Sequence, residues 1–145
     1  FIRARDEPTE IRLGEPGGGT GAGWRTVYEN TLGELEASVL LGEHLGSGAE
    51  QAARGWDGDR YRLLEGPGGG RALVWYSVWD SAAAADRFAE AYCRVLERRA
   101  ERRHGRVERL EVQGRPVVRV VDAERAVPLD SIPVPPLVAL FASDR

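Results

Sequence analysis

The chain has 145 residues, 42% of them apolar and 30% charged, with a formal net charge of −3. The length suits one domain and is too short for two ordinary ones, and the composition is that of a soluble globular domain. It excludes a chain that is disordered throughout, a collagen, a disulfide scaffold and a bundle of transmembrane helices. Because nucleic-acid-binding proteins usually carry a basic face, the acidic balance predicts no nucleic-acid partner.

All basic residues are arginine, and the sequence begins at Phe1 and contains no methionine. We therefore expect a processed protein or the ordered part of a longer polypeptide. Residues 1–23 are predicted to form a flexible entry segment. Within it, Ile11 and Leu13 alternate with charged residues as in a short strand, and the many glycines between positions 14 and 23 indicate a linker or surface loop.

A single domain is predicted over residues 24–122. Residues 24–28 alternate and fit either an edge strand or the lead-in to a helix. Thr31 and Glu34 have the spacing of a helix cap, and from Asp59 onward the apolar period changes from helical to extended. Two helices are predicted, one over 32–45 and a short one that ends at 55, and two strands follow at 60–65 and 71–79. A third helix is predicted over 82–103, followed by two strands at 107–112 and 116–121.

These elements predict an α+β fold. Two hairpins would form an antiparallel sheet of about four strands, with two main helices on one face, in the order α-α-β-β-α-β-β. A ferredoxin-like arrangement is the close variant. Asp80 or Ser81 is expected to cap the long helix, and Gly105 to end it. Residues 123–145 are predicted to be a proline-rich C-terminal tail.

The sequence offers little for catalysis, a cofactor or a metal. A P-loop is excluded because the chain has no lysine, and the two histidines, His44 and His104, fall short of the three protein ligands of catalytic zinc. Cys93, the single cysteine, is expected to be buried and inert. Asp57 and Asp59 resemble the opening of a calcium loop, but a turn that starts a strand is the preferred interpretation. We predict no catalytic, cofactor-binding or metal-binding residues.

Three surfaces are candidates for binding a partner. Trp75 and Trp79 share one face of a strand and Tyr76 lies on the other; core packing is the first interpretation, and an uncovered sheet face is the alternative. Arginines exceed glutamates between 94 and 109, which is typical of a solvated helix face or, alternatively, of a surface for an anionic partner. The proline-stiffened tail offers apolar anchors. The candidate residues are Trp75, Tyr76, Trp79, Arg94, Arg98, Arg102, Pro135, Pro136, Leu137, Leu140 and Phe141.

Four sequence patterns resemble a module of uncharacterised bacterial secreted or lipoprotein-like proteins and of haloarchaeal surface proteins. They are GWDGDRY at 55–61, ALVW at 72–75, VWD at 78–80 and FAEAY at 88–92. The resemblance covers roughly residues 8–122. In longer bacterial relatives the module follows a zinc-metallopeptidase-like region, whose His-Glu-x-x-His motif has no counterpart here.

The resemblance implies an extracytoplasmic location, periplasmic or at the cell surface, and a non-catalytic accessory role. We expect protein partners, including a membrane complex, and membrane association only through a partner or a missing N-terminal region. The longest apolar run, 137–142, is too short to cross a bilayer. Two alternatives stay open. One is a structural subunit of a large membrane-associated complex, and the other is a remnant of a metallopeptidase-like hydrolase, which predicts bound zinc.

Overall fold

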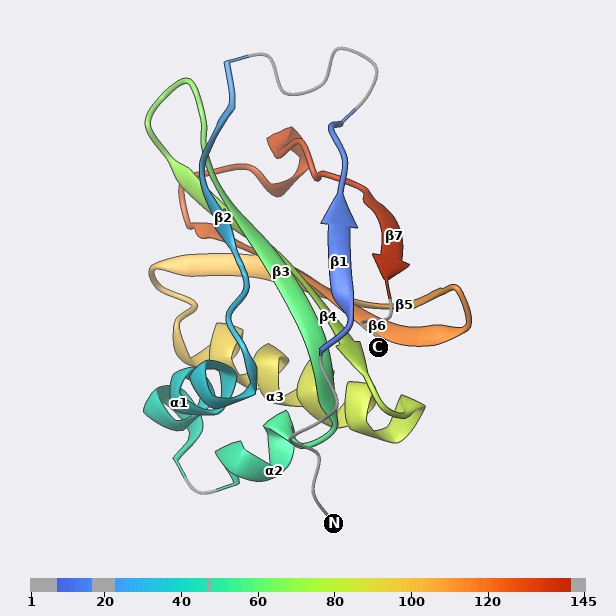
Figure 1. Ribbon diagram of the computed structural model, residues 1–145. Coiled ribbons are helices and arrows are strands. Elements are labelled where there is room, and N and C mark those ends of the chain that lie inside the picture. The colour runs from blue at the N-terminus through green and yellow to red at the C-terminus, as the bar shows by residue number, and fades with distance from the viewer. Residues whose placement is uncertain (1–7, 17–22, 47, 142–145) are drawn as a thin grey trace.

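Strands make up most of the regular structure (Figure 1). The computed structural model describes residues 8–16, 23–46 and 48–141. Its elements, in chain order, are β1 (Glu10–Leu13), β2 (Arg25–Asn30), α1 (Glu34–Leu45), α2 (Ala49–Ala53), β3 (Trp56–Glu65), β4 (Arg71–Trp79), α3 (Ala82–Arg98), β5 (Arg103–Val112), β6 (Arg115–Glu124), the 3-10 helix η1 (Leu129–Ser131) and β7 (Leu137–Phe141).

The strands form two antiparallel sheets. The larger sheet has five strands in the order β2-β3-β4-β6-β5, and the smaller pairs β1 with β7. The β3–β4 and β5–β6 hairpins are the two that local sequence predicts. Gln113 and Gly114 connect β5 to β6 with positive φ angles of 52° and 76°, which suits the right-handed twist of a tight hairpin.

The predicted α+β fold with a sheet of about four strands, and its ferredoxin-like variant, are wrong. β2 adds an edge strand to the large sheet, and β1 and β7 form a second sheet that the prediction lacks. These last two strands lie in the segments predicted as entry and tail, and their register joins Ile11 to Leu140. A pairing between strands so far apart in sequence leaves no local pattern that periodicity can detect.

The region after α3 also differs from the prediction. α3 ends at Arg98, and β5 already begins at Arg103. Gly105 lies inside β5 opposite Asp122 and does not end the helix. A Cβ atom at Gly105 would lie 2.0 Å from the Val121 carbonyl oxygen. The glycine therefore permits a close approach of two strands, a role that sequence alone does not distinguish from helix termination.

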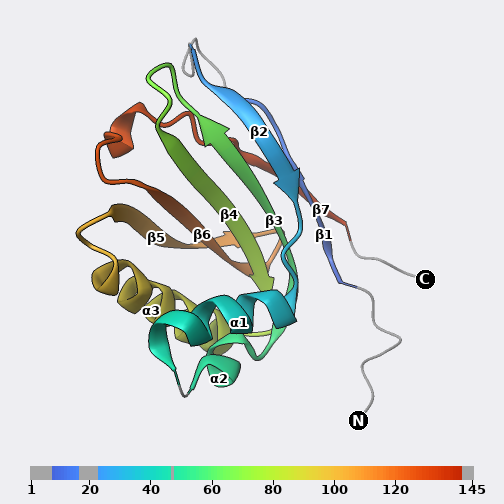
Figure 2. The ribbon, with the colours of Figure 1, turned by 90° about the vertical axis from the view of Figure 1, so that its left-hand side faces the viewer.

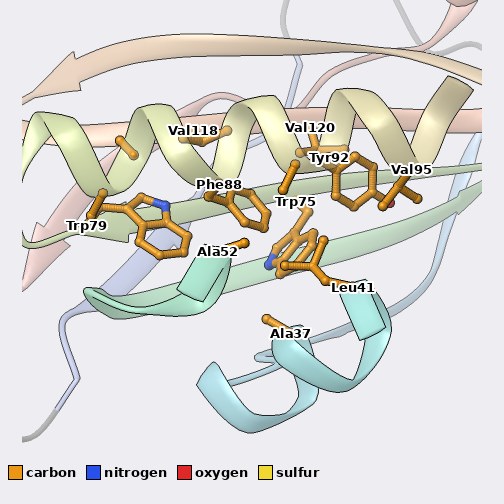
Figure 3. Packing of buried hydrophobic residues seen from close by; sticks show 13 residues of the cluster. Ala37, Leu41, Ala52, Trp75, Trp79, Phe88, Tyr92, Val95, Val118 and Val120 are labelled. Carbon is orange, nitrogen blue, oxygen red and sulfur yellow. The ribbon is translucent and has the colours of Figure 1, made fainter. Parts of the chain in front are cut away.

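The helices cover one face of the large sheet and enclose a core rich in aromatic residues (Figures 2 and 3). Trp75 and Phe88 meet edge to face with their ring centroids 5.3 Å apart, and Trp79 stacks on Phe88 at 4.8 Å. α3 starts at Ser81, whose hydroxyl accepts a hydrogen bond from the Ala84 N–H, so the predicted cap is confirmed. We call the aromatic-rich cluster between the helices and the large sheet the helix-side core.

The opposite face of the large sheet is covered by β1, β7 and the chain between β6 and β7 (Figure 2). This second core joins Val74, Tyr76 and Val117 of the large sheet to Ile11 and Leu140 of the small one. The large sheet is therefore the middle layer of three. Its central strand β4 is buried on both faces, as its sequence predicts.

Candidate functional site

The 55–61 segment lies where β1, the start of α1 and the end of β4 converge. Its glycines allow close contacts: a Cβ at Gly55 would lie 2.7 Å from the Ala84 Cβ, and one at Gly58 would lie 2.2 Å from the Thr9 carbonyl oxygen. The Asp80 N–H donates to the Gly55 carbonyl over 2.8 Å. These contacts explain why small residues stand at these two places in the motif.

Asp59 is the buried anchor of this corner. Its carboxylate accepts the backbone N–H groups of Leu32 at 2.7 Å and Gly33 at 2.8 Å, and the indole N–H of Trp75 at 2.9 Å. Gly33 is the N-cap residue of α1 and no side chain of the helix caps it, so the cap predicted at Thr31 is wrong. Sequence reasoning missed this role because Asp59 is distant in sequence from Leu32 and Gly33, whose backbone N–H groups it accepts just before α1.

Asp57 makes a separate set of contacts. It accepts a hydrogen bond from the Thr9 hydroxyl over 2.7 Å and forms an ion pair with Arg115. The two aspartates of the motif therefore bind different parts of the chain, and the segment is an extended strand rather than a calcium loop. Within the described ranges, no three His, Cys, Asp or Glu residues are grouped as metal ligands would be.

The aromatic candidates are core residues. Trp75 and Trp79 belong to the helix-side core and Tyr76 to the second core, and each is at most 1% exposed. The Tyr76 hydroxyl donates to the Pro135 carbonyl over 2.8 Å. The two faces are assigned as predicted, but none of these three side chains offers surface to a partner in this structure.

The tail candidates lie mostly against their own domain. Pro135 and Leu140 are buried, Leu137 is half-buried, and Pro136 accepts a backbone hydrogen bond from Gly14. The Gln113 side chain bonds the Leu140 backbone at both its N–H and its carbonyl. Only Pro136 and Phe141 of the tail candidates are exposed, so residues 128–141 are not a free docking segment here.

Four arginines of the 94–109 stretch are engaged within the protein. Arg103 donates to the buried Asp122 over 2.6 Å, and Arg99 lies 3.8 Å from the same carboxylate. Arg106 pairs with Asp130, and Arg109 pairs with Asp86 at 2.6 Å. These bonds connect α3, the turn after it and β5 with one another, with β6 and with the chain after β6.

The remaining three arginines of that stretch form what we call the arginine ridge: Arg94, Arg98 and Arg102. All three are exposed, and their side chains pair with no residue in the part of the chain that the structure describes. Arg94 and Arg98 lie four residues apart near the C-terminal end of α3, a spacing that places side chains on one side of a helix, and Arg102 lies in the turn between α3 and β5. These are the three positions that the sequence predicts as the arginine part of a partner surface.

The other titratable candidates carry no active-site arrangement. Cys93 is exposed, contrary to prediction, and partial burial followed by the charges of Glu97 and Glu90 raises the pKa of its thiol. A raised pKa makes a thiol a poorer nucleophile at neutral pH. His104 donates from Nε2 to the Val127 carbonyl over 2.6 Å. The side chain of His44 lies outside the described residues.

Burial, the Asp122 carboxylate and its hydrogen bond raise the pKa of the Tyr92 hydroxyl well above its ordinary value, so this group stays protonated and donates to Asp122 over 2.7 Å.

Among the described helices, none is long and apolar enough to cross a membrane.

The fold defines a mostly β protein in which a five-stranded antiparallel sheet lies between helices and a small second sheet. Residues 22–132 match the family model of a domain of unknown function, DUF8575, and the chain belongs to this family. The match includes the large sheet and all three α-helices, but not β1 or β7. No curated protein and no solved structure matches the chain.

Proposed function

We propose that this protein is a non-catalytic, extracytoplasmic accessory domain that binds an acidic protein partner through the arginine ridge. The observation that supports this proposal is a contrast among the arginines between positions 94 and 109. Arg99, Arg103, Arg106 and Arg109 each meet a carboxylate of the protein, whereas the three ridge arginines are exposed and pair with no described residue.

The chemistry of the ridge favours carboxylates on the partner. A guanidinium group can donate two parallel hydrogen bonds to one carboxylate, and it is always charged. Arg98 also stands in the last turn of α3, where a cation is favourable for the helix dipole even without a partner. That second role accounts for Arg98 but not for Arg94, which lies a full turn earlier, or for Arg102, which lies beyond the helix.

The extracytoplasmic location and the accessory role rest on the resemblance of the four sequence patterns at 55–61, 72–75, 78–80 and 88–92 to a module of secreted and surface proteins. A structural subunit of a large membrane-associated complex is the second candidate, and the same exposed ridge favours it. The two candidate functions predict different stoichiometry and different binding strength. An accessory contact made by exposed charges weakens as the salt concentration rises, whereas a structural subunit stays bound to its complex.

The test starts from the tagged, full-length chain in its native host. Native electrophoresis of a detergent extract gives the size of its complex, and mass spectrometry identifies the main partner. Purified partner is then titrated against the wild-type chain and the triple variant Arg94→Gln/Arg98→Gln/Arg102→Gln. We expect the triple variant to bind about tenfold more weakly, and wild-type binding to weaken as salt rises.

The matched control is Arg12→Gln/Arg25→Gln/Arg54→Gln, which removes the same charge from exposed positions on other surfaces. This control should bind like the wild type. A native protein that runs as a free monomer, or a ridge variant that binds as tightly as the wild type, would overturn the proposal.

A further inference from the structure

A cavity of about 350 Å³ opens beside the start of β3. β2 pairs with β3 only as far as Tyr61, so residues 56–60 extend past the end of β2 and leave room at this edge of the sheet. The polar and aromatic residues that line the cavity are Thr9, Glu10, Thr31, Trp56, Asp59 and Arg60. Its volume is at the small end for ligand pockets and suits a group of side-chain size.

Asp59 brings a buried negative charge to this cavity with no described cation against it. It is 2% exposed, and its three hydrogen-bond donors are two backbone amides and an indole, all neutral. A carboxylate has about four acceptor positions, and Oδ1 receives only one of these bonds. The contacts within the described residues therefore leave one acceptor position of Asp59 unused.

The other buried aspartate, Asp122, is paired with cationic side chains. Asp122 is 1% exposed and meets two arginines, Arg103 at 2.6 Å and Arg99 at 3.8 Å. Buried charges are normally paired in this way, because removal from water is costly. Asp59 thus differs from Asp122 in lacking a cationic partner in the described chain.

Arg60 also lines the cavity, but its charge is already balanced. Its Nε donates to the Glu29 carboxylate over 2.7 Å, on the neighbouring strand β2. Glu10 lies on β1 with its side chain exposed, and no described cation pairs with it. The cavity therefore combines two carboxylates that have no described cation against them with one arginine that is ion-paired with Glu29.

Trp56 supplies the aromatic wall. It packs against the helix-side core and also lines the cavity, so the core holds one part of the indole in place. The faces of aromatic rings attract organic cations. The hydroxyl of Thr31 adds a further acceptor at the cavity wall, which ammonium and guanidinium groups can use.

We propose that this cavity binds an organic cation, an ammonium or guanidinium group on a short aliphatic chain, between the carboxylates of Asp59 and Glu10 and the ring of Trp56. A lysine or arginine side chain of a peptide has this chemistry. The cavity and the arginine ridge carry opposite charge, so the two sites select different ligands, and neither proposal rests on the other.

The test uses N-acetyl-arginine amide as the probe and N-acetyl-citrulline amide as its neutral isostere, each titrated into the full chain and followed by the indole N–H signals in NMR. The Trp56 signal is assigned from a Trp56→Phe variant. We expect saturable binding of the arginine probe that shifts the Trp56 signal, and no such binding of the citrulline probe. Equal binding of the two probes, or no binding of either, would overturn the proposal.

Three variants locate the site. Glu10→Gln should weaken binding about two- to fivefold, Trp56→Leu about three- to thirtyfold, and Asp59→Asn should abolish it. Glu111→Gln, an exposed residue on β5 at the far edge of the sheet, is the control and should bind like the wild type. If Asp59→Asn does not fold, Glu10→Gln and Trp56→Leu decide: unchanged affinity in both would contradict the assignment.

Discussion

Asp59 shows how much of this fold depends on a single side chain. Its carboxylate joins the start of α1 to the centre of the large sheet, because the same group accepts backbone amides from Leu32 and Gly33 and the indole N–H of Trp75. The local sequence predicts a cap at Thr31, which would need only neighbouring residues. No side chain caps α1, and Asp59 of β3 instead holds the two residues just before it, so the chain that enters α1 is tied to the large sheet.

Replacement of Asp59 by alanine should strongly destabilise the protein. The substitution leaves three donors without their acceptor, two of them at the start of a helix, and we expect the free energy of unfolding to fall by about 3 kcal/mol. Urea titration followed by circular dichroism measures this change. Glu111→Ala removes an exposed carboxyl and should cost less than about 0.5 kcal/mol. Similar values for the two variants would refute the anchoring role.

At the scale of elements, the edge strand β2 is attached to β3 by ion pairs as well as by the backbone. Glu29 accepts from Arg60 at 2.7 Å and from Arg62 at 2.9 Å, and Arg62 is itself buried. Burial raises the pKa of Glu29, but the hydrogen bonds and charges of Arg60 and Arg62 outweigh it, so the pKa lies below its ordinary value of 4.5. The ionised form is therefore the one that holds the edge strand.

This lowered pKa makes the contribution of Glu29 depend on pH. Its stabilisation is present above the unfolded-state value near 4.5 and is lost as the pH falls through the lower folded-state value. Glu29→Gln should therefore cost about 1 to 2 kcal/mol at pH 7, and the gap to the wild type should close toward about pH 3. Urea unfolding at both pH values measures it. A gap that does not change with pH would contradict this assignment.

At the scale of the whole molecule, the face of the large sheet opposite the helices needs a cover that the family match does not fully include. The family match ends before β7 and begins after β1, yet Ile11 and Leu140 from these strands complete the second core. In this chain the apolar face of Tyr76, Val78 and Val117 is covered partly by β1 and β7, which lie outside the matched region, and partly by Val127 and Ile132, which lie inside it. The large sheet thus depends on both ends of the described chain for its cover.

A fragment of residues 22–132 should expose that face. We expect it to bind a hydrophobic dye such as ANS and to self-associate or fail to fold, because a contiguous apolar sheet face becomes accessible to solvent. Sedimentation and dye fluorescence measure both effects. Val138→Ala in the full chain changes an exposed residue of β7 and should behave as the wild type does. A monomeric fragment with wild-type Tm and no dye binding would show that the small sheet is dispensable.

Local sequence was sufficient for the elements whose partners are neighbours. α1, β4 and the two hairpins follow from periodicity and turn residues, and Ser81 was recognisable as a cap because it acts three residues away. The ridge arginines were also identifiable, because charge excess and helical spacing are both local. The cavity beside β3 was not, because its walls come from β1, the β2–α1 loop and β3.

The amino-acid sequence by itself determined a two-faced central strand and the helices and hairpins around it, because side-chain periodicity is a property of consecutive residues. Only the tertiary structure decided the three-layer order, the burial of Trp75, Tyr76 and Trp79, and the pairing of β1 with β7. Those features depend on contacts between distant segments, where the burial of apolar surface and the satisfaction of backbone groups outweigh local preference. The same contacts place Asp59 against the start of α1 and leave the arginine ridge exposed.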